Sequence, residues 1–488
     1  MIKKVLYGRE NIRHSHVFQE LCYVDGEFRG TPKTPVYCPA TGLLLGSVPL
    51  FGNDEAEYAV NAAQRAFIPW AQKTAKERAS ILGRWNQLVL LHREELAQLL
   101  TAEQGKPLVE SLGEIDYAAS YIEFYAEEAK RIAGETLPSH RPGGQTFVFR
   151  QPVGVVAAIT PWNFPAAMIT RKVAPALAVG CTVVVKPAPE TPLTALALAK
   201  LAHDAGFPAG IFNVITGDAK AIGKVLTGHK DVRVISFTGS TETGRILMRD
   251  AASGVKRMAL ELGGNAPFIV FNDADLDKAI EAAIVAKFRN MGQTCVCVNR
   301  FYVQDEIHDL FVERFAEAIS KLKVGDGFHD GINQGPLINA RAVEKITDHI
   351  ADALSNGASL HIGGKPHVLG GTFFEPTLIS RVNSNMRISR EETFGPVAAV
   401  FRFYEEKEAI ILANDTEYGL AAYVFSKDIG RVFRVTEALE YGMVGINSGF
   451  ISTELAPFGG IKQSGNSREG SRHGVEEYLD KKYAFISG

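Results

Sequence analysis

The sequence has no hydrophobic run long enough to cross a membrane. Its longest apolar stretch, residues 173–185, is interrupted by Pro175 and Gly180, whereas a membrane-spanning helix needs roughly 20 consecutive apolar residues. The start of the chain carries Lys3 and Lys4 without the apolar segment that completes a secretory signal. We therefore expect a protein that is not exported and has no membrane partner.

Cysteine and net charge are also scarce. The five cysteines are an odd number and none is spaced as Cys-x-x-Cys, which argues against a disulfide framework and against structural zinc. The formal net charge is −3 and no long basic run occurs, so the chain has no field that would attract nucleic acid. These absences predict a cytoplasmic protein with no metal and no nucleic-acid partner.

What the chain does have is length. Its 488 residues exceed what a single hydrophobic core supports, so two or three domains are expected. Residues 23–28 and the Pro- and Gly-rich stretch to residue 49 have the pattern of short strands and turns. Helical spacing of apolar residues then predicts three long helices, over residues 56–70, 81–100 and 115–132.

A predicted hairpin at residues 135–151 precedes a first α/β unit. Alternating strands and helices predict a parallel sheet covered on both faces, with ligands beyond the carboxyl ends of its strands. The strand-like runs are residues 154–160, 182–186, 212–215 and 233–237, and the helical runs are residues 166–179, 193–205 and 219–226. The last strand enters a glycine turn, residues 237–245, that opens a helix whose free N–H groups would suit a pyrophosphate. Glycine turns of this kind also occur for steric reasons alone.

A second alternation between residues 266 and 447 predicts another α/β unit. Its strand-like runs are residues 266–271, 301–304, 397–403, 421–425 and 444–447, and its helical runs are residues 274–288, 307–322, 340–356, 406–414 and 429–439. Because a nucleotide-binding unit precedes it, we expect this unit to carry the catalytic residues.

Cys295 is the candidate nucleophile. It lies in a polar, glycine-containing loop between a predicted helix and a predicted strand, where backbone N–H groups or a cation can favour the thiolate. The alternative is a small buried hydrophobe, as most cysteines are. Glu261, beside a glycine turn, is a candidate functional carboxylate, because burying a carboxylate without a partner is costly. A salt-bridged structural glutamate is the alternative.

Seven short motifs resemble those of the aldehyde dehydrogenase superfamily, in the family's order and over nearly the whole chain. They are Pro161-Trp162-Asn163-Phe164-Pro165, Lys186-Pro187-Ala188, Phe237-Thr238-Gly239-Ser240, Glu261-Leu262-Gly263-Gly264, Gly292-Gln293-Thr294-Cys295, Glu391-Glu392-Thr393-Phe394-Gly395-Pro396 and Pro457-Phe458-Gly459-Gly460.

The resemblance implies an α/β fold of the aldehyde dehydrogenase kind. Its expected parts are a Rossmann-like cofactor-binding domain (residues 1–130 and 152–259), a catalytic domain with a tunnel-lining C-terminal loop (residues 260–469) and a protruding β oligomerisation element (residues 131–151 and 470–488). The hairpin and the tail, residues 478–486, are expected to pair between subunits of a homodimer or homotetramer, since strands at a chain end leave unpaired backbone groups.

The activity that the resemblance implies is the NAD(P)-dependent oxidation of an aldehyde. Cys295 as thiolate would form a thiohemiacetal, whose oxyanion the side-chain amide of Asn163 and the backbone N–H of Cys295 would hold. After hydride transfer to the nicotinamide, Glu261 would activate the water that hydrolyses the thioester. Glu261 weighs against the acylating branch, which hands the acyl group to coenzyme A. A non-catalytic scaffold with this fold, the other alternative, would be expected to have lost Cys295 or Glu261.

The resemblance also assigns a cofactor site. In relatives selective for NAD an acidic residue commonly lies three places after the lysine that matches Lys186; here that place is Pro189, and Glu190 follows it. A missing carboxylate removes repulsion against a 2′-phosphate, and Lys186 supplies a cation. We therefore expect NADP to be preferred and NAD to be tolerated, although Glu190 leaves the opposite preference open. The expected cofactor-binding residues are Thr160, Pro161, Trp162, Lys186, Pro189, Glu190, Gly239, Ser240, Leu262, Glu392 and Phe394.

Arg171, Arg289 and Ser452 match positions by which succinate-semialdehyde dehydrogenases resemble one another. They would bind the distal anion of an ω-carboxylated aldehyde such as succinate semialdehyde. Glutarate semialdehyde and sulfolactaldehyde carry the same kind of anion and are the alternatives. Each arginine could instead cap a helix or pair with a carboxylate. Cys297 is a candidate redox switch through a strained disulfide with Cys295, and the alternative is a packed spectator.

Overall fold

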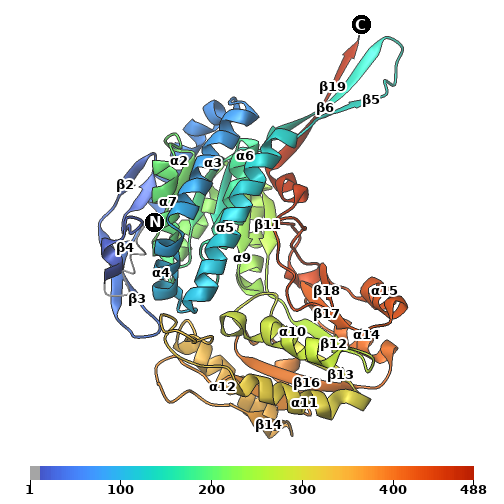
Figure 1. Ribbon diagram of the computed structural model, residues 1–488. Helices are drawn as coiled ribbons and strands as arrows, with labels where there is room; N and C mark the ends of the chain where they lie inside the picture. The colour runs from blue at the N-terminus through green and yellow to red at the C-terminus, as the bar shows by residue number, and fades with distance from the viewer. Residues whose placement is uncertain (1–10, 488) are drawn as a thin grey trace.

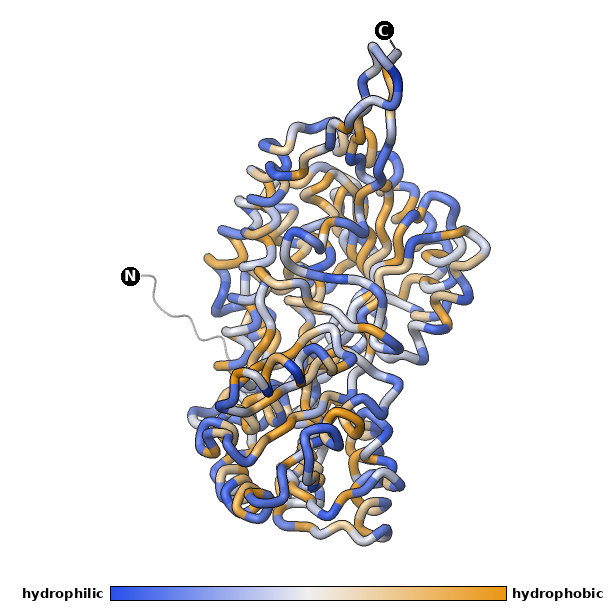
Figure 2. The backbone as a smooth tube through the Cα atoms, turned by 90° about the vertical axis from the view of Figure 1, so that its right-hand side faces the viewer, coloured by the Kyte–Doolittle hydropathy of each residue, from blue (hydrophilic) through white to orange (hydrophobic). Residues whose placement is uncertain are grey.

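The computed structural model describes residues 11–487, which form two α/β lobes and a three-stranded sheet that projects from them (Figure 1). Hydrophobic segments gather inside the lobes, and the projecting sheet stands clear of both (Figure 2). Within this part of the chain no helix is long and apolar enough to cross a membrane. No group of three or more His, Cys, Asp or Glu side chains in the same residues could hold a metal ion. The predicted α/β class is confirmed.

Short strands open the described chain and four α-helices follow them. They are η1 (Ile12–His14), β1 (Cys22–Val24), β2 (Glu27–Arg29), β3 (Pro32–Tyr37), β4 (Leu44–Pro49), α2 (Asn53–Ala71), α3 (Ala75–Leu91), α4 (Arg93–Gln104), α5 (Leu108–Glu128) and η2 (Ala129–Arg131). The prediction of three helices was wrong at His92, whose φ of −99° and ψ of 21° end α3 before α4 begins. The helical spacing hides this break because α3 and α4 bury their apolar faces in the same core.

The first lobe contains a seven-stranded sheet in the order β11-β10-β7-β8-β9-β1-β2. The strands from β11 to β9 are parallel, and β1 and β2 extend the sheet in antiparallel fashion. Its remaining elements are β7 (Val155–Ile159), α6 (Ala167–Val179), β8 (Thr182–Lys186), α7 (Pro192–Asp204), β9 (Phe212–Val214), α8 (Ala219–Gly228), β10 (Val232–Thr238), α9 (Thr241–Ala251), η3 (Ala252–Gly254) and β11 (Arg257–Glu261). The sequence did not predict β11, which places Glu261 beside Thr238 at the carboxyl edge of the sheet.

The second lobe contains another seven-stranded sheet, in the order β14-β15-β16-β13-β12-β17-β18, parallel except for β14. Its elements are β12 (Ala266–Val270), α10 (Leu276–Phe288), η4 (Arg289–Gly292), β13 (Val298–Gln304), α11 (Asp305–Ser320), α12 (Ala340–Ser355), β14 (Ser359–Ile362), β15 (Thr377–Ser380), α13 (Arg387–Arg390), β16 (Val397–Phe403), α14 (Glu406–Asn414), β17 (Ala421–Phe425), α15 (Ile429–Ala438), β18 (Met443–Ile446) and η5 (Lys462–Ser464). The predicted strands and helices are present, and the short elements β14, β15 and α13 were not predicted.

The projecting sheet consists of β5 (Glu135–Leu137), β6 (Gly144–Pro152) and β19 (Leu479–Ser487). The tail, which was expected to pair with another subunit, pairs antiparallel with β6 of its own chain along its whole length. Just before it, η6 (Arg472–Tyr478) packs into the first lobe, where the Tyr478 hydroxyl donates to Ser236 Oγ at 3.2 Å. The domain ranges and the oligomeric state stay predictions.

Candidate active site

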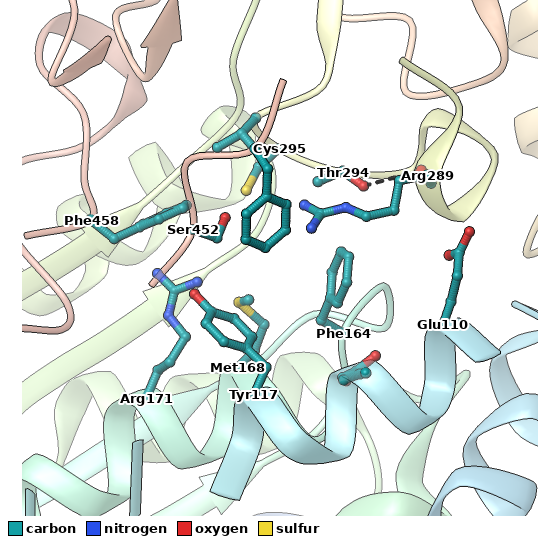
Figure 3. A pocket seen from close by; sticks show the side chains of 14 residues that line it. Glu110, Tyr117, Phe164, Met168, Arg171, Arg289, Thr294, Cys295, Ser452 and Phe458 are labelled. Carbon is teal, nitrogen blue, oxygen red and sulfur yellow. Dashed lines mark hydrogen bonds between the residues drawn. The ribbon is translucent and has the colours of Figure 1, made fainter. Parts of the chain in front are cut away.

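Two cavities meet at Cys295. The first has a volume of about 230 Å³ and is lined by residues of α5 and α6 and by loops of the second lobe (Figure 3). The second has a volume of about 330 Å³ and lies where the carboxyl end of β10 faces α12. Cys295 and Met168 line both cavities. The sulfur can therefore be reached from two sides.

The loop that carries Cys295 is tightly held. Asn290 and Met291 have left-handed backbones, with φ of 51° and 56°, and Gly292 lies so close to another loop that a Cβ there would be 2.3 Å from the Gly395 carbonyl oxygen. Gly264 allows a similar approach, because its Cβ would be 2.6 Å from the Cys295 carbonyl oxygen. These contacts fix the backbone and leave the thiol at the junction of the cavities.

Charge around the thiol is mixed. Burial raises the pKa of Cys295 to about 12, although Arg171 and Arg289 oppose the shift. The expected cations are therefore present, but burial outweighs them. The thiol of the free protein is protonated at neutral pH and must lose its proton before it can attack.

Asn163 lines the second cavity beside Cys295. Its Nδ2 donates to the Gln293 carbonyl at 3.0 Å, which leaves one of its two N–H groups for a ligand. Its backbone carbonyl accepts hydrogen bonds from Lys106 Nζ at 2.7 Å and from Asn290 Nδ2 at 3.0 Å. The backbone of Asn163 is thus held by two hydrogen bonds, and its side-chain amide lies at the wall of the second cavity.

Glu261 is buried at the end of β11 and lines neither cavity. Its Oε1 accepts from the Ser467 hydroxyl at 3.1 Å, and its Oε2 has no hydrogen-bond partner among residues 11–487. Burial, together with the charge of Glu469, raises the pKa of Glu261 well above its usual value. To act on a group bound to Cys295, the carboxyl must turn away from Ser467.

Arg171 pairs with a buried carboxylate and also lines the first cavity. Its Nη2 lies 2.6 Å from Glu469 Oε2, and Lys172 Nζ lies 2.5 Å from Glu469 Oε1. Although burial opposes it, these two cations lower the pKa of Glu469, which is ionised. Arg171 therefore pairs with a carboxylate, as the alternative interpretation of the sequence had it, and it also lines the first cavity.

Arg289 differs because no carboxylate of the described chain lies within ion-pair distance of it. Its guanidinium lies 5.5 Å from the centre of the Phe164 ring and 5.0 Å from that of Phe450. It points into the cavity toward Ser452, across from Arg171 (Figure 3). The structure thus brings both arginines and Ser452 to one cavity that ends at Cys295.

Most of the expected cofactor residues line the second cavity. Ser240 begins α9 as its N-cap, and the Trp162 and Phe394 rings meet edge to face at 5.6 Å. Burial raises the pKa of Glu392 to about 7, and its Oε1 accepts from the Gly264 N–H at 3.0 Å. The expected residues in this lining are Pro161, Trp162, Gly239, Ser240, Leu262, Glu392 and Phe394.

Residues 27–484 match the model of the aldehyde dehydrogenase family. The chain belongs to this family. The succinate-semialdehyde dehydrogenase [NADP(+)] of Escherichia coli is 57% identical over 97% of this chain and 99% of the relative. A glutarate-semialdehyde dehydrogenase of Pseudomonas aeruginosa and a 3-sulfolactaldehyde dehydrogenase of Pseudomonas putida are each 55% identical over 98% of this chain and 99% of the relative. The crystal structure of a succinate-semialdehyde dehydrogenase from Burkholderia pseudomallei is 56% identical, with a TM-score of 0.96 over 97% of this chain and 98% of that one.

These matches confirm the predicted aldehyde dehydrogenase fold and the predicted enzyme class, an NAD(P)-dependent aldehyde dehydrogenase. They support a semialdehyde of the succinate type as substrate.

Four of the expected cofactor residues of this aldehyde dehydrogenase lie outside the second cavity. Lys186 and Pro189 line a separate cavity of about 30 Å³, Glu190 is half-buried beside them, and Thr160 is buried. Burial lowers the pKa of Lys186, while Glu190 and Asp218 act in the opposite direction. None of these four residues lines the second cavity.

The sequence analysis missed several residues that line the two cavities of the aldehyde dehydrogenase. Arg341 and Lys345 of α12 face the second cavity, and their spacing of four residues on a predicted helix was a usable signal. Glu110 and Tyr117 of α5 face the first, but their sequence surroundings carry no such signal.

Cys297 is buried behind the nucleophile loop. Lys287 Nζ donates to its Sγ at 3.4 Å, and the thiol donates to the Lys287 carbonyl at the same distance. Both Cys295 and Cys297 are free thiols, and a redox role for Cys297 stays a prediction.

Proposed function

We propose that the protein oxidises aldehydes that carry a distal anion, with succinate semialdehyde as the main substrate and NADP as the preferred cofactor. The observation that carries the proposal is Arg289, an unpaired guanidinium within the described chain that faces the cavity ending at Cys295. An unpaired cation among aromatic rings attracts an anion strongly, because little water screens it. The distal carboxylate would bind at this cation and the carbonyl carbon would approach the sulfur.

The residues at the junction of the cavities suit the chemistry. Asn163 and the backbone N–H of Cys295 would hold the oxyanion formed when the thiolate attacks, a contribution of roughly 10² to 10³ in turnover per donor. The nicotinamide, when bound, accepts the hydride from the reacting carbon. Glu261 would then turn from Ser467 and take the proton of the water that hydrolyses the thioester.

The second cavity fits a dinucleotide. Thr238 lines it, and its buried hydroxyl has no hydrogen-bond partner among residues 11–487. Ser240 begins α9, whose free N–H groups suit a pyrophosphate. The preference for NADP over NAD rests on Lys186 and on Pro189 in the place of an acidic residue. Lys186, with Thr160, Pro189 and Glu190, would meet the far end of the cofactor.

The proposed substrate class includes aldehydes of other chain lengths and with other distal anions. The relatives named for glutarate semialdehyde and 3-sulfolactaldehyde support these two aldehydes as further substrates. We also propose a homodimer or homotetramer in the cytoplasm, joined through the projecting sheet. Support comes from Phe149, Tyr483 and Ile486 on that sheet, which are exposed large hydrophobic residues.

A substrate panel tests the proposal. The purified enzyme is given succinate semialdehyde, glutarate semialdehyde, sulfolactaldehyde and butanal with each cofactor, and reduction is followed by the absorbance of NADPH or NADH. We expect the highest kcat/KM for succinate semialdehyde with NADP. An equal or higher kcat/KM for butanal would refute the distal-anion proposal, and a higher kcat/KM with NAD would refute the cofactor preference.

A further inference from the structure

A pair of tyrosines lies at the Arg171 end of the first cavity. Tyr117 lines the cavity, and its ring and hydroxyl lie beside Arg171 and face Ser452 (Figure 3). Its hydroxyl oxygen is 2.9 Å from that of Tyr121, one turn further along α5. The Tyr121 hydroxyl donates to the Thr453 carbonyl at 3.3 Å. The pair thus joins α5 to the loop that carries Ser452.

The direction of these hydrogen bonds follows from the groups involved. A carbonyl oxygen only accepts, so the Tyr121 hydrogen is committed to Thr453, and Tyr121 can only accept from Tyr117. Tyr117 then turns its lone pairs toward the cavity, which is unfavourable beside an anion. Each hydroxyl has one hydrogen, and both can rotate. When an anion arrives, Tyr117 can donate to it and Tyr121 can donate to Tyr117.

The charge at this end of the cavity explains why an extra donor is needed. Arg171 shares the Glu469 carboxylate with Lys172, so part of its charge is already compensated. The hydroxyl that contacts Tyr117, that of Tyr121, carries no charge at neutral pH, because burial raises the pKa of Tyr121 well above its usual value. An anion that lies between Arg171 and Arg289 would therefore find one compensated and one free cation. A hydroxyl at the compensated end would complete its hydrogen bonds.

We propose that Tyr117 is a further substrate-binding residue, whose hydroxyl donates to the distal anion after the Tyr117–Tyr121–Thr453 chain reverses. This inference rests on the proposed function, because it concerns the same anion. Through Tyr117, helix α5 would contact the distal anion of the substrate directly. Tyr121 is a positioning residue, which supplies the acceptor in the free enzyme and the donor in the complex.

The first test is Tyr117→Phe, which removes the hydroxyl and keeps the ring. We expect the ratio of kcat/KM for succinate semialdehyde to that for butanal to fall about tenfold, the effect of losing one charge-assisted hydrogen bond. The loss should lie mainly in KM. The inhibition constant of succinate, used as a probe of anion binding without chemistry, should rise by a similar factor. Tyr404→Phe, at an exposed tyrosine, is the matched control and should change neither value.

The second test is Tyr121→Phe, which separates substrate binding from support of the loop. The variant removes both the acceptor that holds the Tyr117 hydrogen in the free enzyme and the donor to Tyr117 in the complex. Because these two effects oppose each other, we expect the ratio to stay near the wild-type value. Equal losses in both variants would mean that the pair only holds the loop, and an unchanged ratio in Tyr117→Phe would exclude the contact; either result overturns the proposal. If the wild-type enzyme already fails to prefer succinate semialdehyde over butanal, the proposed function itself is wrong and this inference falls with it.

Discussion

The two cavities that meet at Cys295 hold their positive charge in different ways. In the first, Arg171 is fully buried against Glu469, and Arg289 lies between two aromatic rings. In the second, Arg341 and Lys345 are exposed on α12. Charges that are shielded from water act strongly over a few ångströms, whereas exposed charges are screened. We infer that the first cavity selects its ligand by charge, and that the second binds its ligand mainly through backbone groups and aromatic side chains.

This difference divides the site into three parts: the residues at the junction, those of the substrate side and those of the cofactor side. A change at the junction should affect every reaction of the enzyme. A change on one side should affect only the ligand bound there. The predictions below test this division in order of expected effect.

Glu261→Gln should have the largest effect, because it removes the proposed base for every substrate. We expect thioester hydrolysis to slow roughly 10²- to 10⁴-fold, with a burst of NADPH equal to the enzyme concentration followed by a stall. Since burial raises the pKa of Glu261 well above its usual value, hydrolysis by the wild type should accelerate as pH rises and the carboxyl ionises. Stopped-flow absorbance measures both phases.

The control for this variant is Glu57→Gln, at an exposed glutamate of α2. It should keep the wild-type steady rate. If Glu261→Gln turned over without a stall, another group would be the base.

Arg289→Ala should affect the substrate side alone. Removing a charge-assisted hydrogen bond worth about 1.5 to 3 kcal/mol should lower kcat/KM for succinate semialdehyde roughly 10- to 150-fold. The loss for butanal should be much smaller, and the KM of NADP should stay near the wild-type value. Arg249→Ala, whose side chain is 73% exposed in the wild type, is the matched control. Equal losses for both aldehydes would show that Arg289 supports the loop rather than the anion.

Local sequence patterns were enough to predict the junction and much of the cofactor side, for a physical reason. Cys295 and Glu392 lie in or beside short motifs with left-handed backbones, at residues 290–292 and at Phe394. Such constraints leave a local pattern that resembles the family's. The alternating strands and helices also leave a pattern, so both parallel sheets were predicted.

The surroundings of the anion site leave no local pattern. Tyr117 reaches the loop that carries Ser452 only because α5 packs beside a segment more than 300 residues away. The aromatic neighbours of Arg289, Phe164 and Phe450, also come from distant segments, one before it and one after it in the chain. Strand β11 was missed because only its last three residues are buried. Contacts of this kind are properties of the packed chain and not of any window of sequence.

Lys186→Met should affect the cofactor side alone. If Lys186 meets the 2′-phosphate, the ratio of kcat/KM with NADP to that with NAD should fall about tenfold, as expected for one partly screened charge pair. The preference between succinate semialdehyde and butanal should not change. Lys278→Met, whose side chain is 75% exposed in the wild type, is the control. If the ratio of kcat/KM with NADP to that with NAD did not change, a residue other than Lys186 would contact the phosphate. Fluorescence titration with NADPH would show whether cofactor binding has changed at all.

Glu110→Gln should have the smallest effect. This variant tests whether anion binding in the first cavity depends on the ionisation of a carboxyl group. Glu110 lines the first cavity, and its Oε2 accepts from the Asn290 N–H, next to Arg289, at 2.9 Å. Burial raises the pKa of Glu110 to about 7, although Lys106 and Arg289 oppose the shift. The group is therefore mostly neutral at pH 6 and mostly ionised at pH 8.

Ionised Glu110 lowers the positive potential at Arg289, so anion binding should weaken as pH rises through this window. We expect the inhibition constant of succinate to increase roughly two- to fivefold between pH 6 and pH 8, the size of a weak charge–charge interaction. Glutamine resembles the neutral form, so the variant should keep the low-pH value throughout. Glu306→Gln, at an exposed glutamate of α11, should follow the wild type. The same pH dependence in Glu110→Gln would mean that another group titrates, and the charge on the substrate side would then be fixed by its arginines alone.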